Sequence, residues 1–366
     1  MISGPLQAYF SSLSALLLFL VIVVKCDLLQ KRTRQLFLIE AVVLLILIAS
    51  SWGNYAIIHQ FDPGDYVLVK EILFSIQFVL CPVSPLMIVL IFMDYPSTKY
   101  EKLLFLPLMA NIVMAVGSIF YDWVFSVDQS GTYHRGPWFW ITFAVAFFYM
   151  LSMLHFSYRQ KNRLNKHVET VLLSGILLLI AAATMIEIFF RVSFLIWSTT
   201  VVTVIIYYLF LTVQIILYDP LTGCYSRIAY SKKLGLIDSL RDCTLAMVDV
   251  NDLKRINDQF GHEQGDKAIC DVVNAIMRFK SSDMDLYRFG GDEFVLLSSK
   301  CRVEKMTKVL KQAQGYLKES EPGYVSFAYG VTIYNKRNDI HEAIAQADEM
   351  MYLAKQCEKG CIPSLD

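Results

Sequence analysis

At residues 288–294 the sequence reads Arg-Phe-Gly-Gly-Asp-Glu-Phe, and this stretch joins two apolar runs, 286–289 and 294–297. A glycine pair between β-prone runs predicts a tight hairpin, because glycine adopts positive φ at little cost. The carboxylates of Asp292 and Glu293 would then stand at the hairpin tip, where they can hold a divalent cation. The glycines leave the backbone open to a ligand, so the pattern indicates a site for a metal-bound phosphate.

Segments on both sides of this hairpin follow the order β-α-α-β-β-α-β-α. We expect strands at 244–250, 286–289, 294–297 and 324–334, and helices at 252–260, 265–280, 302–319 and 340–356. This order predicts an α/β domain with a split-βαβ, ferredoxin-like (palm-type) sheet and helices on one face. In such a sheet the strand that ends in Asp249 would lie beside the hairpin and face Asp292.

Several polar residue types near the predicted strand ends suit nucleotide chemistry. Carboxylates such as Asp249 and Asp292 suit Mg²⁺, which binds one or two of them together with substrate phosphates, and two such ions can clamp the oxygens of a nucleotidyl transfer. The helix N-terminus before Lys254 offers N–H groups to phosphate. An amide and a carboxylate, Asn257 and Asp266, can together recognise guanine. Each feature alone also fits an ordinary surface turn or a solvated helix, so the interpretation depends on their combined spacing.

Seven apolar stretches precede this part of the chain. Hydrophobic residues make up 55% of the 366 residues and charged residues only 18%, which is more apolar than a soluble enzyme requires. The stretches, each near the ~20 residues that span a bilayer, are 5–24, 35–58, 72–93, 103–124, 137–157, 169–190 and 195–217. We therefore expect an all-α seven-helix transmembrane bundle over residues 1–217, followed without a linker by the α/β domain over 218–366.

Basic residues alternate between the loops and predict the orientation of the bundle. One set of alternate loops carries Lys25, Lys31, Arg32, Arg34, Lys99, Lys102, Arg159, Lys161, Arg163 and Lys166, whereas the other set carries Lys70, Arg135 and Arg191. Because basic loops stay in the cytoplasm, the N-terminus is expected outside. An odd number of spans then places residues 218–366 in the cytoplasm.

Polar residues within the predicted spans are few, and Glu40, Asn111 and Glu187 are the most prominent. An acid inside a membrane is a functional candidate by default. Glu187 either pairs with Arg191 one helical turn away or lies near enough to the outer surface to be wetted, and the sequence leaves both alternatives open. Pro82, Pro85 and Pro107 can kink the third and fourth spans and open a cavity between helices.

The soluble half resembles the GGDEF domain of diguanylate cyclases over nearly all of residues 219–366. Its blocks occur in the family order: Asp219-Pro220-Leu221-Thr222-Gly223 with Arg227, Asp249-Val250-Asn251 with Lys254 and Asn257-Asp258, Gly261-His262 with Gly265-Asp266, the signature at 290–294, Tyr329-Gly330-Val331, and Ala347-Asp348 with Met351-Tyr352 and Ala354-Lys355. The resemblance implies that two GTP molecules are joined into cyclic di-GMP, with release of two pyrophosphates. It implies Mg²⁺ or Mn²⁺ as cofactor, and a homodimer as the active unit because each subunit presents one GTP.

The resemblance also implies a role for each matched residue. Asp249 would bind the metal through its side chain and Val250 through its carbonyl. Asp292 would bind metal and help to deprotonate the attacking 3′-hydroxyl, and Glu293 would support the metal site. The implied substrate-binding residues are Asn257, His262, Asp266, Lys254, Gly290, Gly291, Lys355 and Lys359.

Several positions depart from the family pattern. Asn251 replaces a frequent aspartate, Ser226 a usual asparagine and Ala328 a frequent serine, and Lys359 replaces a common arginine and so loses bidentate phosphate geometry. The family's product-inhibition motif is Arg-x-x-Asp, but the aligned window 281–284 reads Ser-Ser-Asp-Met. We therefore expect no inhibitory site in this domain.

The membrane half is similar, more loosely, to the seven-span sensor modules of bacterial histidine kinases and cyclases. We accordingly expect a multi-pass protein of the bacterial inner (plasma) membrane, whose cyclase is gated by an unknown sensory ligand and which has no nucleic-acid partner. One alternative is a catalytically silent GTP-binding module that signals through protein contacts. Another is a transporter with a regulatory tail, although such a protein needs charged pathways and the spans hold few charges.

Overall fold

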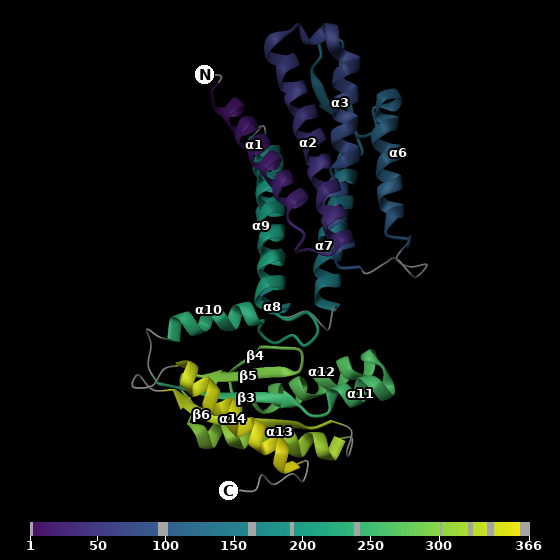
Figure 1. Ribbon diagram of the computed structural model, residues 1–366. Helices are drawn as coiled ribbons and strands as arrows, with labels where there is room; N and C mark the ends of the chain where they lie inside the picture. Colours follow the sequence, from purple (N-terminus) through teal and green to yellow (C-terminus); the bar gives the residue numbers. More distant parts are fainter. Residues whose placement is uncertain are drawn as a thin grey trace. The chain divides into compact units, whose positions relative to one another are not determined.

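The computed structural model describes residues 3–93, 102–159, 166–190, 194–237, 242–300, 302–320, 325–334 and 340–358. The chain divides into two compact units, Met1–Thr212 and Val213–Asp366 (Figure 1). This division falls within helix α9 (Leu195–Leu217), so the last turn of that helix is counted with the second unit.

The first unit is mainly helical. Its helices are α1 (Ser3–Lys25), α2 (Lys31–Gln60), η1 (Pro63–Tyr66), α3 (Val67–Leu80), α4 (Val83–Ile91), α6 (Phe105–Tyr121), α7 (Trp140–Arg159), α8 (Lys166–Phe190) and α9. Within the described residues, 6 helical segments are long and apolar enough to cross a membrane, and Pro63–Ile91 is one of them. The remaining predicted span corresponds to α6, an apolar helix of 17 residues. This length is at the lower limit for crossing a bilayer.

The third span is interrupted where a kink was predicted, because α3 ends at Leu80 and α4 begins at Val83. Pro82, between them, cannot donate a backbone hydrogen bond and so interrupts the helix. Beside the break, Ser84 donates a hydrogen bond to the carboxylate of Glu40, which is 1% exposed. The interruption thus brings a polar side chain to a buried acid.

The other two prominent polar residues of the spans have structural partners. Asn111 donates to the carbonyl of Phe78 (2.9 Å) and accepts from the hydroxyl of Thr142 (2.7 Å), which ties three helices together. Glu187 accepts a hydrogen bond from the backbone N–H of Ile196 at 2.9 Å, in the first turn of α9. A carboxylate there is favoured by the free N–H groups of the helix end. Arg191, the alternative partner of Glu187, lies outside the described residues.

The prediction of an all-α first unit is wrong in one respect. Between α6 and α7 lies an antiparallel hairpin of β1 (Phe125–Val127) and β2 (Tyr133–Arg135). Asp128 organises its turn by accepting from the N–H groups of Ser130 and Thr132, both at 2.9 Å. Gly131 has φ +75 there, and such short turns between polar residues are not visible to a search for apolar spans.

The second unit contains one four-stranded sheet with five helices in the described ranges. Its elements are α10 (Arg227–Ile237), β3 (Cys243–Val250), α11 (Leu253–Phe260), α12 (His262–Phe279), β4 (Asp285–Arg288), β5 (Glu293–Ser298), α13 (Val303–Ser320), β6 (Phe327–Tyr334) and α14 (Ile340–Glu358). The strands lie in the order β4-β5-β3-β6, and every pairing is antiparallel (Figure 1). The predicted strands and helices after residue 243 are therefore confirmed, whereas α10 was not predicted.

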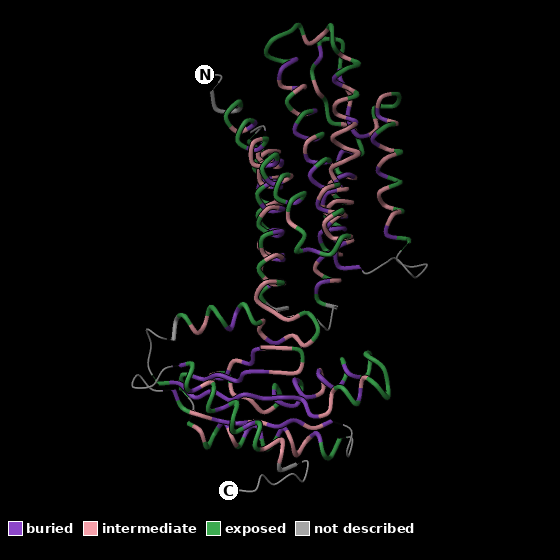
Figure 2. The backbone as a smooth tube through the Cα atoms, viewed as in Figure 1, coloured by how far each residue is buried: buried purple, intermediate pink, exposed green. Residues whose placement is uncertain are grey.

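Helices cover both faces of this sheet, so the prediction of helices on one face is wrong. On β3, Ala246 and Val248 belong to a core with residues of α12 and α13, while Leu245 and Met247 belong to another with residues of α10 and α14. Every residue of β3 is buried, and Figure 2 shows the strand as an unbroken buried segment. A strand buried on both faces reads as a near-continuous apolar run, which is how residues 245–248 read.

We predict that Gly330 on β6 is needed for the close approach of α14. A β-carbon at this position would collide with the carbonyl oxygen of Ala347 and lie 2.6 Å from the backbone nitrogen of Met351. Gly330→Ala should therefore lower the free energy of unfolding of the second unit by about 1–3 kcal/mol, measured by pulse proteolysis of the full chain in urea.

The matched control is Gly315→Ala on α13, where a β-carbon meets nothing within 4 Å. Because alanine is the better helix former, this change should stabilise the unit by up to about 1 kcal/mol. Equal unfolding midpoints for Gly330→Ala and the wild type would contradict the packing argument.

Candidate functional site

The glycine hairpin lies directly against the end of β3. Strand β5 pairs with β3 so that Glu293 stands opposite Asp249, and the N–H of Val250 donates to the carbonyl of Asp292 at 3.1 Å. The turn is closed by two hydrogen bonds to the carbonyl of Glu293, from Phe289 (2.8 Å) and from Gly290 (3.1 Å). The expected neighbourhood is therefore present, with the refinement that Glu293, not Asp292, is the residue directly opposite Asp249.

Four carboxylates and one lysine influence each other at this point. The ammonium of Lys355 on α14 lies 2.5 Å from Oδ1 of Asp249. Burial raises the pKa of Asp249; Lys355 opposes this rise, while Asp292 and Asp348 add to it. Burial likewise raises the pKa of Glu293, and the nearby Asp249, Asp292 and Asp348 raise it further. The site therefore carries more negative charge than its lysine neutralises.

This surplus of negative charge fits a divalent cation. Among the residues that the structure describes, no three His, Cys, Asp or Glu side chains are grouped closely enough to hold a metal ion by themselves. The donor set thus suits an ion that takes one or two carboxylates from the protein and its other ligands from phosphates and water, which is the preference of Mg²⁺. Asp249 and Glu293, adjacent in register, are the carboxylates best placed for it.

The residues expected to recognise guanine come from α11 and α12. Gly265 lies so close to the amide of Asn257 that a β-carbon there would be 2.8 Å from its Cγ. Asp266 follows Gly265, and His262 lies one turn earlier on the same helix. The side chain of Asn257 therefore lies against the turn of α12 that carries both residues.

Two of the predicted phosphate-binding lysines are described. Lys254 is exposed in the first turn of α11, which begins after Asp252 with φ +51, and Lys355 is paired with Asp249. Lys359 lies outside the described residues. Of the two, Lys355 alone is shown in contact with a predicted metal ligand.

Asn251, which stands where the family often has aspartate, has a structural role. Its amide Nδ2 donates to the hydroxyl of Ser326 at 2.9 Å, and its N–H donates to the carbonyl of Ser326, also at 2.9 Å. These bonds tie the end of β3 to the residue before β6. The substitution therefore leaves the neighbouring Asp249 in place.

Arg288 links the hairpin to the first loop of the domain, and the sequence interpretation missed it. Its guanidinium donates to Oδ1 of Asp219 at 2.9 Å, and to the carbonyls of Gly291 at 2.7 Å and Gly290 at 3.3 Å. Burial by itself would raise the pKa of Asp219. The hydrogen bonds from Thr222 and Arg288 outweigh burial and lower this pKa below its usual value. An arginine two residues before the glycine pair was the available signal, but its acidic partner is 69 residues away.

The loop that contains Asp219 makes hydrogen bonds both to the end of α9 and to strand β4. Ser226 donates from its hydroxyl to the carbonyl of Ile216 (2.6 Å) and from its N–H to that of Leu217 (2.8 Å). Three tyrosine rings, those of Tyr218, Tyr225 and Tyr287, then stack in sequence with centroids 4.9 Å and 5.2 Å apart. Helix end, loop and hairpin strand thus form one connected assembly within the second unit.

The window that aligns with the family's inhibitory motif is used by the fold itself. Met284 is fully buried in the core, and Asp283 accepts from the ammonium of Lys305 at 3.2 Å. A hydrogen bond from Ser281 and the charge of Lys305 lower the pKa of Asp283 to about 2. The aligned position of the motif's aspartate is therefore an apolar core position here.

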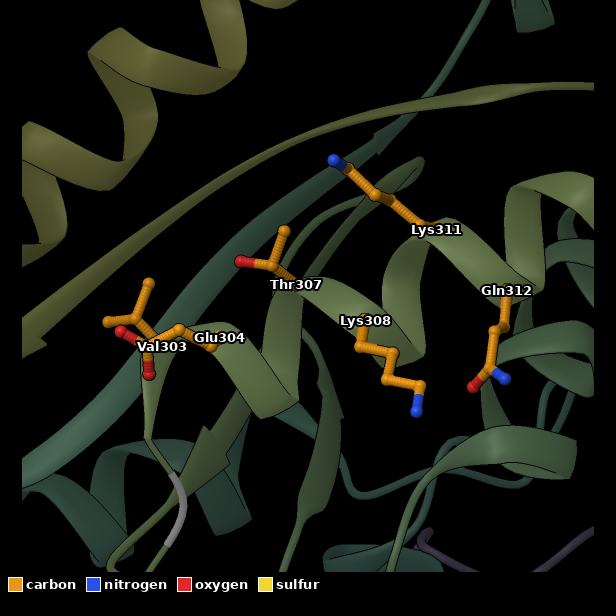
Figure 3. Close-up of a pocket in the computed structure, with 6 residues that line it drawn as sticks. All are labelled: Val303, Glu304, Thr307, Lys308, Lys311 and Gln312. Carbon is orange, nitrogen blue, oxygen red and sulfur yellow. The ribbon is translucent and has the colours of Figure 1, made fainter.

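A hollow of about 520 Å³ on α13 lies outside this site (Figure 3). It is lined by Val303, Glu304, Thr307, Lys308, Lys311 and Gln312. In the close-up Lys311 and Thr307 point to one side and Lys308 and Gln312 to the other, so their polar groups do not converge on a common point. We interpret this hollow as a solvated helix face.

Comparison with known proteins gives the C-terminal part a family. Residues 216–361 match the family described as "Diguanylate cyclase, GGDEF domain". The chain is 33% identical over 151 residues to diguanylate cyclase DgcP of Pseudomonas aeruginosa, covering 38% of this chain and 22% of that protein. It is 26% identical over 163 residues to diguanylate cyclase VdcA of Vibrio cholerae, covering 41% of this chain and 47% of that protein.

The chain therefore spans less than half the length of the curated relatives named here. Among solved structures, the coiled coil and GGDEF domain of DgcB from Caulobacter crescentus, in complex with c-di-GMP, is similar with a TM-score of 0.42 and 21% identity, covering 44% of this chain and 91% of that one. From the family match, residues 216–361 form a GGDEF domain.

Proposed function

We propose that this chain is a membrane-bound diguanylate cyclase that condenses two GTP molecules into cyclic di-GMP and two pyrophosphates. The observation that carries the proposal is the register of β3 on β5, which sets Asp249 against Glu293 beside Asp292 at the tip of the glycine turn. The family match over residues 216–361 supports the choice of reaction. The metal-ligand and hairpin residues that the reaction requires are present, so no specific observation favours a silent module.

In this mechanism the protein mainly positions and neutralises charge. A bound Mg²⁺ or Mn²⁺ would offset the negative charge of the phosphates and favour the alkoxide form of the attacking hydroxyl. The carboxylates of Asp249, Asp292 and Glu293, with the carbonyl of Val250, would hold it. Asp292 would accept the proton of the 3′-hydroxyl of one GTP. The oxygen of that hydroxyl would bond to the α-phosphorus of the other GTP, and pyrophosphate would leave.

The substrate contacts of the proposal come from several elements. Asn257 and Asp266 would hold the guanine with His262 nearby, Gly290 and Gly291 would let the phosphates approach the backbone, and the lysines 254, 355 and 359 would bind them. One subunit presents one GTP, so a homodimer is needed to bring the hydroxyl of one GTP in line with the phosphate of the other.

The central prediction concerns Asp292. Purified full-length protein, incubated with GTP and Mg²⁺, should release cyclic di-GMP, and Asp292→Ala should lower the rate by about 10²–10⁴-fold because a general base and metal ligand is lost. Product is measured by liquid chromatography with mass detection. The matched control Glu304→Ala removes an exposed acid on α13, and its rate should equal that of the wild type.

Absence of product from a protein shown to be dimeric, with Asp292→Ala indistinguishable from wild type, would contradict the cyclase proposal. Retained GTP binding in that case would support the alternative of a silent signalling module instead.

A second prediction follows from the window 281–284. Because Met284 is a core residue and Asp283 is paired with Lys305, added cyclic di-GMP should not inhibit the enzyme non-competitively at micromolar concentrations. The measurement is the initial rate at several GTP and product concentrations. A falling maximal rate at unchanged apparent affinity for GTP would show that a product site exists elsewhere.

We further propose that residues 1–217 form a seven-span sensor whose signal reaches the cytoplasmic domain (residues 218–366) through α9. The long apolar helices of the first unit, together with α6, and the alternation of basic loops support this topology. The hydrogen bonds of Ser226 to the last carbonyls of α9 support direct coupling, since a rotation of the helix end would move the loop that Arg288 ties to the hairpin.

This coupling predicts that cyclase activity depends on the rotational phase of α9. Insertion of two alanines between Thr212 and Val213 would rotate the helix end by about 200°, whereas seven alanines would bring it back to within about 20° of its original phase. The two-residue variant should change the rate by about fivefold or more, and the seven-residue variant should resemble wild type. Equal rates in all three proteins would count against rigid coupling.

A further inference from the structure

We propose that Lys355 is a built-in counter-cation of the metal site: it holds Asp249 while no nucleotide is bound and yields it only when a triphosphate accepts the lysine. The part about the triphosphate depends on the proposed function. The part about competition between Lys355 and the metal ion does not.

The contact between the two side chains is close and shielded. The ammonium nitrogen of Lys355 is 2.5 Å from Oδ1 of Asp249, and the side chains are 25% and 12% exposed. Such partly buried, charge-assisted hydrogen bonds are stronger than exposed ion pairs. Lys355 therefore competes with a metal ion for the carboxylate of Asp249 more strongly than a solvated lysine would.

The fold brings Lys355 to this position. Helix α14 lies close to β6, because Gly330 on that strand leaves room for the backbone of Ala347 and Met351. Met351 lies in the core, one turn before Lys355. The lysine thus extends from a helix that packing holds in place, and the ion pair spans 106 residues of sequence.

The charges around the pair explain why a lysine is held there. Asp249 stands opposite Glu293 in the strand register, and like charges directly opposite in a sheet repel. Asp292 and Asp348 lie near enough to add to the negative field at both acids. Lys355 lowers this repulsion in the empty site, so the metal-free fold is stabilised by the residue that a metal must displace.

A divalent cation at this site would bind the same carboxylate. An ammonium group on Oδ1 of Asp249 and a divalent ion on that carboxylate repel each other strongly at such short range, so metal alone should bind weakly. A triphosphate offers Lys355 new anionic oxygens and frees the carboxylate. By thermodynamic linkage, metal and nucleotide then strengthen each other's binding. The site consequently takes up its metal together with its substrate.

The test measures Mn²⁺ binding to the full-length chain in detergent without any nucleotide, by the loss of the free Mn²⁺ electron paramagnetic resonance signal. Asp249→Asn defines the background of other Mn²⁺ sites. Lys355→Met should tighten binding at the Asp249 site by about three- to tenfold, because the competing cation is gone. Lys355→Arg keeps the charge and should bind Mn²⁺ as wild type does.

The matched control is Lys308→Met, which removes the same charge from an exposed position on α13. It should change Mn²⁺ affinity by less than about twofold, since exposed charges are screened by water and salt. Melting curves in a chelator verify that each variant is folded. Unchanged or weaker Mn²⁺ binding by folded Lys355→Met overturns the inference, and so does equal tightening by Lys308→Met.

A second measurement adds a non-hydrolysable GTP analogue. The analogue should tighten Mn²⁺ binding in the wild type more than in Lys355→Met, because the variant has no lysine to relocate. An equal gain in both proteins overturns the relocation. Since the nucleotide-free titration requires no cyclase chemistry, failure of the inference can be distinguished from failure of the proposed function.

Discussion

The antiparallel register of β3 on β5 is the constraint on which the rest of the site depends. It sets Asp249 opposite Glu293 and lets the N–H of Val250 bind the carbonyl of Asp292. A shift by one residue would turn each side chain to the other face of the sheet. The two apolar cores, one on each face of β3, make that shift costly, so the packing of the whole domain keeps the acids together.

The carboxylates of Asp249 and Glu293 lie opposite each other although their charges repel. Burial and mutual repulsion raise the pKa of Asp249 and Glu293, and such crowding is found where a cation is to be bound. Stability supplied elsewhere by apolar packing maintains this arrangement. Arg288 and Lys355 limit the cost locally: one neutralises Asp219 and holds the glycine turn, and the other neutralises Asp249.

Sequence interpretation succeeded where a signal is local. The hairpin at 288–294, the β3 strand and the helix periodicities were predicted because spacing within one segment determines them. It failed where the partner is distant. Arg288 binds Asp219 across 69 residues, and Lys355 binds Asp249 across 106. Helix coverage of both sheet faces was also missed, since it depends on how separate elements pack. The β1–β2 hairpin was missed because its short polar turn is not visible to a search for apolar spans.

The sequence by itself indicated the kind of chemistry: glycines suited to a tight turn, carboxylates suited to a cation, and apolar stretches long enough to cross a membrane. These properties belong to single residues and their near neighbours, so they can be read without a fold. Only the tertiary structure decided which charges meet. Pairing energy depends on distance and burial, and the packing of α14 on β6 brings the ammonium of Lys355 to the carboxylate of Asp249.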